Sequence, residues 1–218
     1  MKWLESVFER RSFITSIGVA GTAALTGESA LQAQSSRAKA WQPARESKDD
    51  WLDKISGKHR MVFDSTMPEG FGSALKFANN FYIANKDGYG LKDSDLAVVI
   101  VARHFSTPFA FVDAMWARYG ATISRLSNFT DPTTKQAPAN NIYMDSLGPL
   151  LQRGVHLAVC GMATRELAGS IAGDLGGDAE KIYTELTGNL VNNSHIVSAG
   201  IVAVNRAQER GYAFVNAQ

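Results

Sequence analysis

The sequence has few of the residues and motifs on which most enzyme chemistry depends. It has one cysteine, Cys160, which excludes an intramolecular disulfide and a cysteine-based structural zinc site. Its four histidines never stand at a metal-ligand spacing such as His-x-x-x-His. The patterns Gly-x-x-x-x-Gly-Lys, Gly-x-Ser-x-Gly and Cys-x-x-Cys are absent as well. We therefore expect no phosphate-loop nucleotide binding, serine hydrolysis or dithiol redox chemistry, and the sequence predicts no cofactor and no contiguous metal site.

An excess of charge of one sign is also lacking. The chain has 22 basic and 21 acidic residues, a formal net charge of +1, and no long basic run. We therefore expect no nucleic-acid partner and no membrane partner for the mature form, because both would need a concentrated positive charge. Apolar residues make up 45% of the chain and charged residues 20%, which is typical of a globular protein.

The first 33 residues have the order of an export signal. Arg10 and Arg11 precede a mildly apolar segment, rich in Gly, Ala and Thr, that ends near Leu25. A cleavage point with a small residue follows at residues 31–33, which end in Ala33. This order is typical of a twin-arginine signal and predicts a periplasmic protein. The apolar run is too short, and too rich in glycine and threonine, for a comfortable membrane span. The alternative is an amphipathic cytoplasmic helix that happens to contain two arginines.

The following residues divide into a linker and one domain. Residues 34–57 are polar and predict a linker with at most a short helix. From residue 58 to residue 218, strand-like and helix-like patterns alternate. The expected strands are 59–64, 96–102, 155–160, 196–197 and 212–215, and the expected helices are 70–85, 107–119, 144–152, 164–175, 179–190 and 200–209. Such alternation predicts an α/β domain with a mostly parallel five-stranded sheet, helices on both faces and right-handed crossovers.

Glycine and proline residues predict where two of the helices begin and end. Thr107 and Pro108 have the residue types of a helix cap and first turn, and Gly120 is expected to end that helix. Residues 121–141 are rich in Asn, Thr and Pro and are expected to be irregular. Gly176 and the residues after it predict one helix end followed by a new helix cap.

Ligands of open parallel sheets bind at the carboxyl ends of the strands, so that edge is where we place the candidate site. Cys160 is the candidate reactive residue. The candidate ligand-binding residues are His104, Gly161, Met162, Ser198 and Gly200.

Cys160 ends the third expected strand, and the helix expected near Thr164 begins just beyond it. A thiol that faces the free N–H groups of a helix N-terminus has its anion stabilised. Gly161 would keep the approach to the sulfur open. The alternative is an inert buried cysteine, since cysteine is among the most buried residue types.

The histidines have different expected roles. His104 follows the buried second strand and could act as an acid or base, or bind a ligand through a ring nitrogen; it could equally be a hydrogen-bonded structural residue. His156 alternates with Cys160 on one face of a strand, which favours a structural role. His195 begins the fourth strand and could approach the edge that carries Cys160, whereas His59 is expected at the surface.

Two segments resemble the DsrE/DsrF-like (YchN-like) sulfur-relay family. In residues 150–163 a helix and a glycine lead into a strand that ends in Cys160, and in residues 198–205 a short strand and a glycine open a helix, as in that family. The similarity extends over roughly residues 58–217. It implies a three-layer α/β/α sandwich, assembly into homotrimers or hexamers, and a sulfur atom carried on Cys160 as a persulfide and passed to the thiol of a partner protein.

Three functions stay open at this point. The first is a periplasmic sulfur carrier, sulfurtransferase-like at most, that uses Cys160. The second is a non-catalytic oligomeric binding module of the same fold, and the third is a metal- or haem-associated accessory protein that uses His104. The aromatic residues between Phe105 and Trp116 are either helix core and oligomer contact or the lining of a small-molecule pocket.

Overall fold

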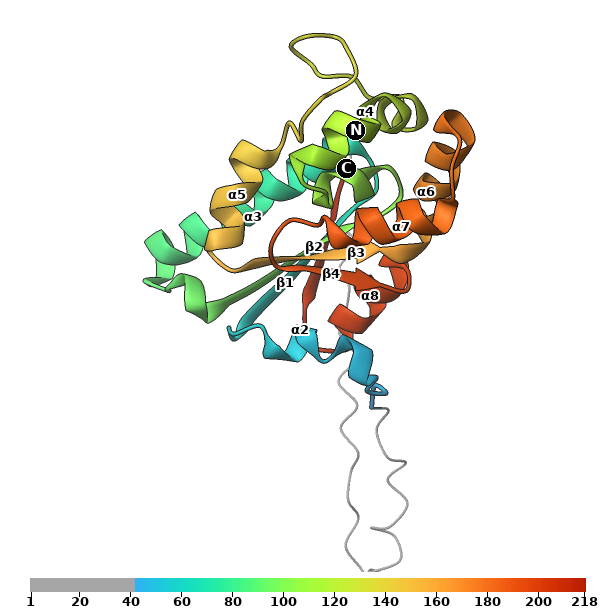
Figure 1. The fold of residues 1–218 in the computed structure, drawn as a ribbon. Helices are drawn as coiled ribbons and strands as arrows, with labels where there is room; N and C mark the ends of the chain where they lie inside the picture. Colours follow the sequence, from blue (N-terminus) through green and yellow to red (C-terminus); the bar gives the residue numbers. More distant parts are fainter. Residues whose placement is uncertain (1–41) are drawn as a thin grey trace, which may run out of the picture. The chain divides into compact units, whose positions relative to one another are not determined.

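The computed structural model describes residues 42–218; the signal predicted for residues 1–33 and most of the linker predicted for 34–57 lie outside the described residues. The described part contains a five-stranded, all-parallel sheet with the strand order β4-β3-β2-β1-β5 (Figure 1). The strands are β1 (His59–Ser65), β2 (Leu96–Ala102), β3 (Val155–Cys160), β4 (Ser194–Val197) and β5 (Ala213–Ala217). The parallel sheet predicted from the alternation is therefore confirmed.

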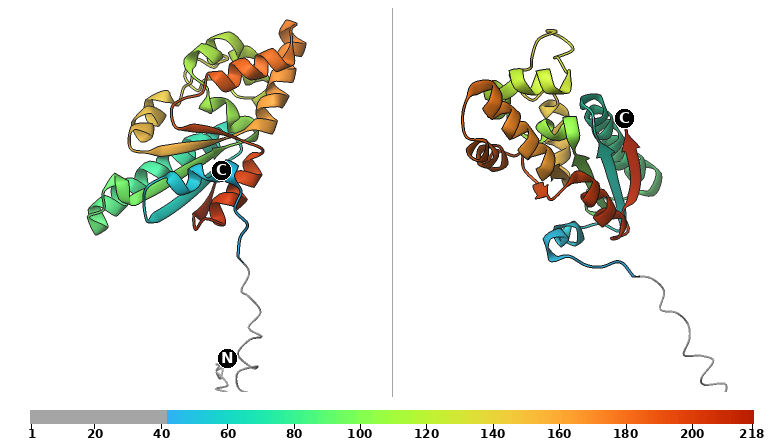
Figure 2. Two further views of the ribbon diagram at one scale, coloured as in Figure 1. Left: turned by 60° about the horizontal axis from the view of Figure 1, so that its bottom comes forward. Right: turned by 90° about the vertical axis from the view of Figure 1, so that its right-hand side faces the viewer.

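Helices cover both faces of this sheet (Figures 1 and 2). The α-helices are α2 (Trp51–Lys54), α3 (Pro68–Tyr89), α4 (Asp113–Ser127), α5 (Met144–Gln152), α6 (Gly161–Leu175), α7 (Ala179–Gly188) and α8 (Gly200–Gln208). Three 3-10 segments are η1 (Ser47–Asp49), η2 (Asp93–Asp95) and η3 (His104–Ala110). One core joins the sheet to α3–α7, and a second joins it to α2 and α8, so the domain is a three-layer α/β/α sandwich.

Strand β2 shows why two cores form. Each of its residues is buried, and its apolar side chains alternate between the two faces. Val98 and Ile100 belong to the core under α3, whereas Val99 and Val101 belong to the core under α2 and α8. A continuous run of β-branched residues is stable only where both faces of the strand are covered, as the sequence predicted.

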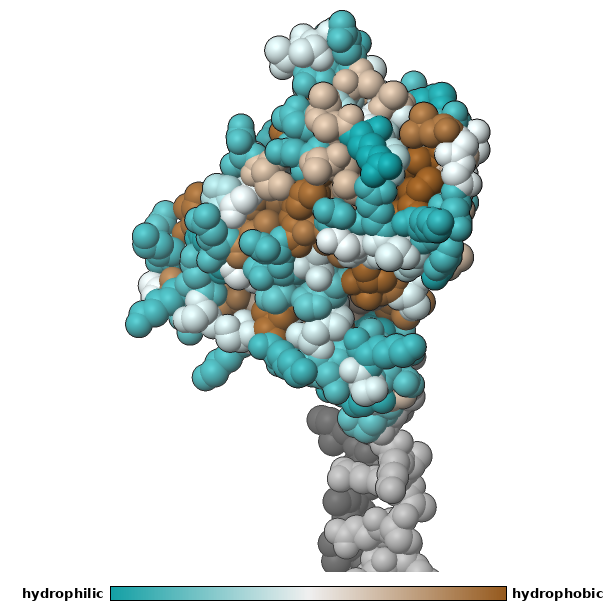
Figure 3. Space-filling model, in the orientation of Figure 1, coloured by the Kyte–Doolittle hydropathy of each residue, from teal (hydrophilic) through white to brown (hydrophobic). Residues whose placement is uncertain are grey.

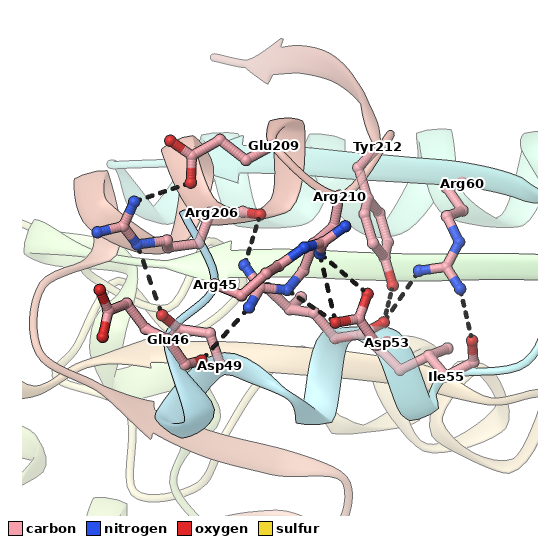
Figure 4. Close-up of polar contacts among 11 residues, drawn as sticks. Arg45, Glu46, Asp49, Asp53, Ile55, Arg60, Arg206, Glu209, Arg210 and Tyr212 are labelled. Atoms are coloured by element: carbon pink, nitrogen blue, oxygen red, sulfur yellow. Dashed lines mark hydrogen bonds and ion pairs between the residues drawn. The ribbon is translucent and has the colours of Figure 1, made fainter. Parts of the chain in front are cut away.

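The segment before β1 is part of the folded unit, which runs from Pro43 to Gln218. Helix α2 buries Leu52 at 1% exposure, together with Ile55, in the second core. The Leu52 carbonyl accepts hydrogen bonds from the Tyr212 hydroxyl at 2.8 Å and from Arg60 at 3.0 Å. Figure 4 shows Tyr212 and Arg60 pointing towards α2, with further polar contacts between this segment and the C-terminal part of the chain. The domain therefore begins earlier than the boundary drawn at residue 58. A single helical turn is too short to show an amphipathic period in the sequence.

The segment after β2 differs from the helix predicted for residues 107–119. Residues 104–110 form 3-10 turns, and α4 begins only at Asp113 and continues to Ser127. Gly120 lies inside α4 and does not end it; a Cβ there would lie 2.1 Å from the Pro138 carbonyl oxygen. The helix ends instead at Asn128, whose φ of 49° gives the left-handed conformation of a C-cap. Gly120 therefore permits close packing of the following loop, and only the residues after Asn128 are irregular.

The remaining elements match the prediction and differ only at their ends. Helix α6 begins at Gly161, three residues before the expected start, so it follows β3 without a loop. The predicted change of helix after Gly176 is confirmed: the Asp178 side chain accepts hydrogen bonds from the N–H groups of Glu180 and Lys181 and caps α7. No helix among residues 42–218 is both long and apolar enough to cross a bilayer.

Candidate functional site

The carboxyl edge of the sheet carries a partly buried ion pair between the ends of neighbouring strands. Asp64, near the end of β1, accepts two hydrogen bonds from Arg103, which follows β2: Nε to Oδ1 at 2.7 Å and Nη2 to Oδ2 at 2.8 Å. This bidentate geometry orients the guanidinium as well as neutralising the carboxylate. The hydrogen bonds to Asp64 raise the pKa of Arg103 above its ordinary value, with smaller contributions from the charges of Asp64 and Cys160. Arg103 therefore carries a fixed positive charge at the edge of the sheet that also carries Cys160.

Two of the predicted ligand-binding residues are close-packing positions. A Cβ at Gly200 would lie 2.4 Å from the Cβ of Arg103, so the Arg103 side chain passes directly over the start of α8. A Cβ at Gly161 would lie 2.8 Å from the Val197 carbonyl oxygen. Both glycines are buried: Gly161 allows a close approach of the β4 backbone, and Gly200 allows a close approach of the Arg103 side chain.

Cys160 is the N-cap of α6. Its Sγ accepts a hydrogen bond from the Ala163 N–H at 3.5 Å, and its carbonyl oxygen accepts one from the Thr164 hydroxyl at 2.9 Å. The sulfur thus faces the positive end of the helix dipole, as the sequence predicted from the position of the strand end. The residue is 7% exposed, so the thiol lies just beneath the surface.

The other predicted residues of this edge lie at the surface. Met162 is 66% exposed and Ser198 is exposed. Ile196 and Ile201 are large apolar side chains that are also exposed. Figure 3 shows a hydrophobic patch where β4 and the start of α8 lie in Figure 1. Ile196 pairs with Val159, the residue before Cys160, so part of this apolar surface lies beside the end of β3.

His104 lines a cavity of about 300 Å³ between η3, α4 and α6. The residue is exposed, and its φ of 55° is unusual for a residue that is not glycine. Its ring lies 3.9 Å, centroid to centroid, from the ring of Phe105, which also lines the cavity. Cys160 is not part of the lining, but Ala163 is. Of the aromatic segment, Phe109 and Trp116 belong to the core, so only part of it borders the cavity.

His195 is the second residue of β4 and pairs with Ala158, two residues before Cys160 in β3. Its ring contacts are with His156 and Trp51. Its Nε2 lies 3.0 Å from Nδ1 of His156. Trp51 of α2 stacks over His195, with ring centroids 4.0 Å apart. Sequence reasoning missed this cluster because Trp51 was assigned to the linker, and because the register that brings β4 beside β3 leaves no local pattern in the sequence.

The environment of the two histidines lowers their proton affinity. Burial lowers the pKa of His156 below its ordinary value. Burial, and then the charge of His156, lower the pKa of His195 from 6.5 to about 4. His59, as predicted, is at the surface. In the described part of the chain, no group of three or more His, Cys, Asp or Glu side chains is placed to hold a metal ion.

Comparison with known proteins adds one distant structural similarity. No model of a protein family matches the chain, and no curated protein sequence matches it. A solved structure titled as a protein of unknown function, MTH1491 from Methanobacterium thermoautotrophicum, is 16% identical and covers 73% of this chain and 99% of its own, with a TM-score of 0.43. The comparisons assign no family. The chemistry of the carboxyl edge is therefore argued from its residues alone.

Proposed function

We propose that this protein is an exported, DsrE-like sulfur carrier that holds a sulfur atom on Cys160 as a persulfide. The observation that supports it most directly is the hydrogen bond from the Ala163 N–H to Sγ at the N-terminus of α6. The sulfur faces the N-terminus of α6, and Arg103 lies at the same edge of the sheet. A thiolate and a persulfide anion are the two states that a sulfur carrier alternates between.

The proposed transfer has two steps, and each conserves atoms and electrons. First, the Cys160 thiolate attacks the terminal sulfur of a donor persulfide; an S–S bond forms on Cys160, the donor S–S bond breaks, and the donor leaves as a thiolate. Next, the thiolate of an acceptor attacks the outer sulfur and releases the Cys160 thiolate. Neither step needs an external oxidant or reductant, or a second cysteine in this chain.

The ion pair at the edge of the sheet has a positioning role in this proposal. Arg103 uses two of its donors on Asp64, which fixes where its charge lies. Gly200 leaves room for the stem of Arg103. The positive charge is thereby held at the edge that carries Cys160 before any donor arrives.

A donor or acceptor protein in the periplasm is the proposed partner, and the chain itself is proposed to assemble as a trimer or hexamer. The thiol of a partner must reach an atom whose residue is only 7% exposed. Met162 and Ser198 are the exposed residues beside it and are where a partner would make contact. The exposed apolar side chains nearby would favour burial against another protein surface.

The second candidate is a non-catalytic, oligomeric binding module, and the burial of Cys160 favours it. A cysteine at the end of a strand can serve only to fill space and cap a helix. The third candidate, a metal- or haem-associated protein that uses His104, gains no support from the donor groups of residues 42–218.

Loading with a persulfide separates the first two candidates. The full chain, incubated with glutathione persulfide, should gain the mass of one sulfur atom, and Cys160→Ser should gain none. Because the chain has one cysteine, intact-protein mass spectrometry assigns the adduct without digestion. A folded wild-type chain that gains no sulfur, and whose thiol reacts with iodoacetamide only after denaturation, would contradict the sulfur carrier and support the binding module.

A further inference from the structure

The cavity beside His104 has the position and size of a small-molecule site. It lies between η3, which follows β2, and α6, which follows β3, and is therefore at the carboxyl edge, where open parallel sheets bind ligands. Its volume of about 300 Å³ is at the lower end of the range for such sites. A molecule with one ring or a short alkyl chain would fill it.

The inner wall of the cavity is apolar. Pro108, Ile123 and Leu167 are buried, and Leu126 and Ala163 complete the wall from α4 and α6. When an apolar group packs against this wall, the apolar surfaces of both the group and the wall are removed from water, which favours binding. The wall therefore selects for an apolar body.

The hydroxyl groups of the lining are already hydrogen-bonded within the protein. Thr107 donates to the Ala102 carbonyl, Ser127 to the Ile123 carbonyl at 2.7 Å, and Ser170 to the Glu166 carbonyl at 3.0 Å. Their hydrogen atoms are therefore not available to a ligand. A ligand must find its polar partners elsewhere on the lining.

Two polar side chains of the lining have no such partner within residues 42–218: the imidazole of His104 and the carboxylate of Glu166. Glu166 is the only acid on the described lining, which has no lysine or arginine. The fixed charge at the mouth of the cavity is thus negative. Its complement is a cation that can also donate hydrogen bonds.

The backbone of His104 is a separate observation that points to the same place. A φ of 55° is costly for a residue with a Cβ and persists only where the surrounding structure holds it. Such conformations concentrate at ligand-binding and catalytic positions. Here the conformation occurs at the residue that brings an imidazole to the cavity directly after the central strand.

We propose that this cavity binds a small primary amine with an apolar body, the ammonium group at Glu166 and His104 and the apolar part against Ile123 and Leu167. The site goes beyond sulfur transfer and does not depend on it, although the Ala163 that lines it also donates to Sγ of Cys160. An occupant would therefore lie within one helical turn of the thiol.

The test uses the full chain, methyl-labelled for NMR, and two probes of similar shape and opposite charge: 2-phenylethylamine and 3-phenylpropionate. We expect the amine to shift the methyl signals of Ile123 and Leu167 with a dissociation constant on the order of 1 mM, and the carboxylate to bind more weakly. Glu166→Gln should weaken amine binding roughly fivefold. The control Asp87→Asn, which deletes an exposed negative charge on α3, should leave amine binding unchanged. Leu126→Trp, which fills the cavity, should abolish it.

Three results would overturn the proposal. They are equal or tighter binding of 3-phenylpropionate, shifts confined to methyl groups outside the cavity, and unchanged amine binding in a folded Leu126→Trp protein. The same titration with the Cys160→Ser variant separates this proposal from the sulfur carrier. That variant cannot form a persulfide, yet it should still bind the amine.

Discussion

Nδ1 of His156 lies 3.0 Å from Nε2 of His195, so the neighbouring parallel strands β3 and β4 are joined by one hydrogen bond between imidazole rings. One ring must donate and the other accept, which requires that at least one of the facing nitrogens be unprotonated. Trp51 stacks over His195, with the ring planes inclined by 11°. The pair therefore links β3, β4 and α2 in a single neutral cluster.

This cluster should make the protein less stable in mild acid. The unfolded chain takes up a proton on His195 as the pH falls from 6.5 towards 4, whereas the folded chain, with its pKa of about 4, does not. The free energy of unfolding is thus highest above pH 6.5 and falls through that window, and the lowered pKa of His156 acts in the same direction. In urea denaturation between pH 7 and pH 4, His195→Gln should flatten this fall, and His59→Gln at the surface should not. An unchanged pH profile in His195→Gln would refute the assignment.

Gly200→Ala should destabilise the carboxyl edge. The new Cβ would meet the stem of Arg103 at 2.4 Å, so the guanidinium or α8 must shift. We expect a loss of about 1–3 kcal/mol in the free energy of unfolding, and slower persulfide loading of Cys160, because Arg103 is displaced. Gly169→Ala is the matched control: nothing lies within 4 Å of its Cβ, and it should stabilise α6 by roughly 0.5–1 kcal/mol. Equal effects of the two substitutions would argue against a packing role for Gly200.

Asp64→Asn should be more costly than the loss of a surface ion pair. The amide cannot accept both hydrogen bonds from Arg103, and a positive charge is left at a partly buried position. We expect roughly 2–3 kcal/mol of destabilisation, below the range for fully buried pairs because about a quarter of the Arg103 side chain is exposed. Glu180→Gln, which breaks an exposed pair with Arg165, should change the urea midpoint little. If both variants unfold at the wild-type midpoint, the Asp64 pair does not stabilise the edge.

Leu52→Ala tests whether α2 belongs to the folded unit. Leu52 is 1% exposed in the second core, and its truncation should cost about 2–4 kcal/mol in chemical denaturation. Ser56→Ala, an exposed position in the same segment, is the control and should stay within about 0.5 kcal/mol of wild type. A Leu52→Ala protein as stable as wild type would mean that residues 43–57 contribute nothing to the fold.

The elements with a clear period were predictable from the sequence. The run from Leu96 to Ala102 identified the central strand with correct ends, since no other structure buries seven apolar residues in a row so readily. The position of Cys160 was predictable as well, because the strand-like run ends at this residue and a helical pattern follows just beyond it. Gly120 was misread because glycine in a helix signals either an end or a close approach, and the sequence does not distinguish them.

The sequence by itself determined the layered architecture and the carboxyl ends of β2, β3 and β4, because hydrophobic period and helix caps are local properties of the chain. Only the tertiary structure decided which side chains meet. Register and strand order bring Arg103 onto Asp64 and over Gly200, and they set His195 beside His156 under Trp51. Contacts between residues far apart in the chain depend on how the strands are ordered, and no local pattern records that order.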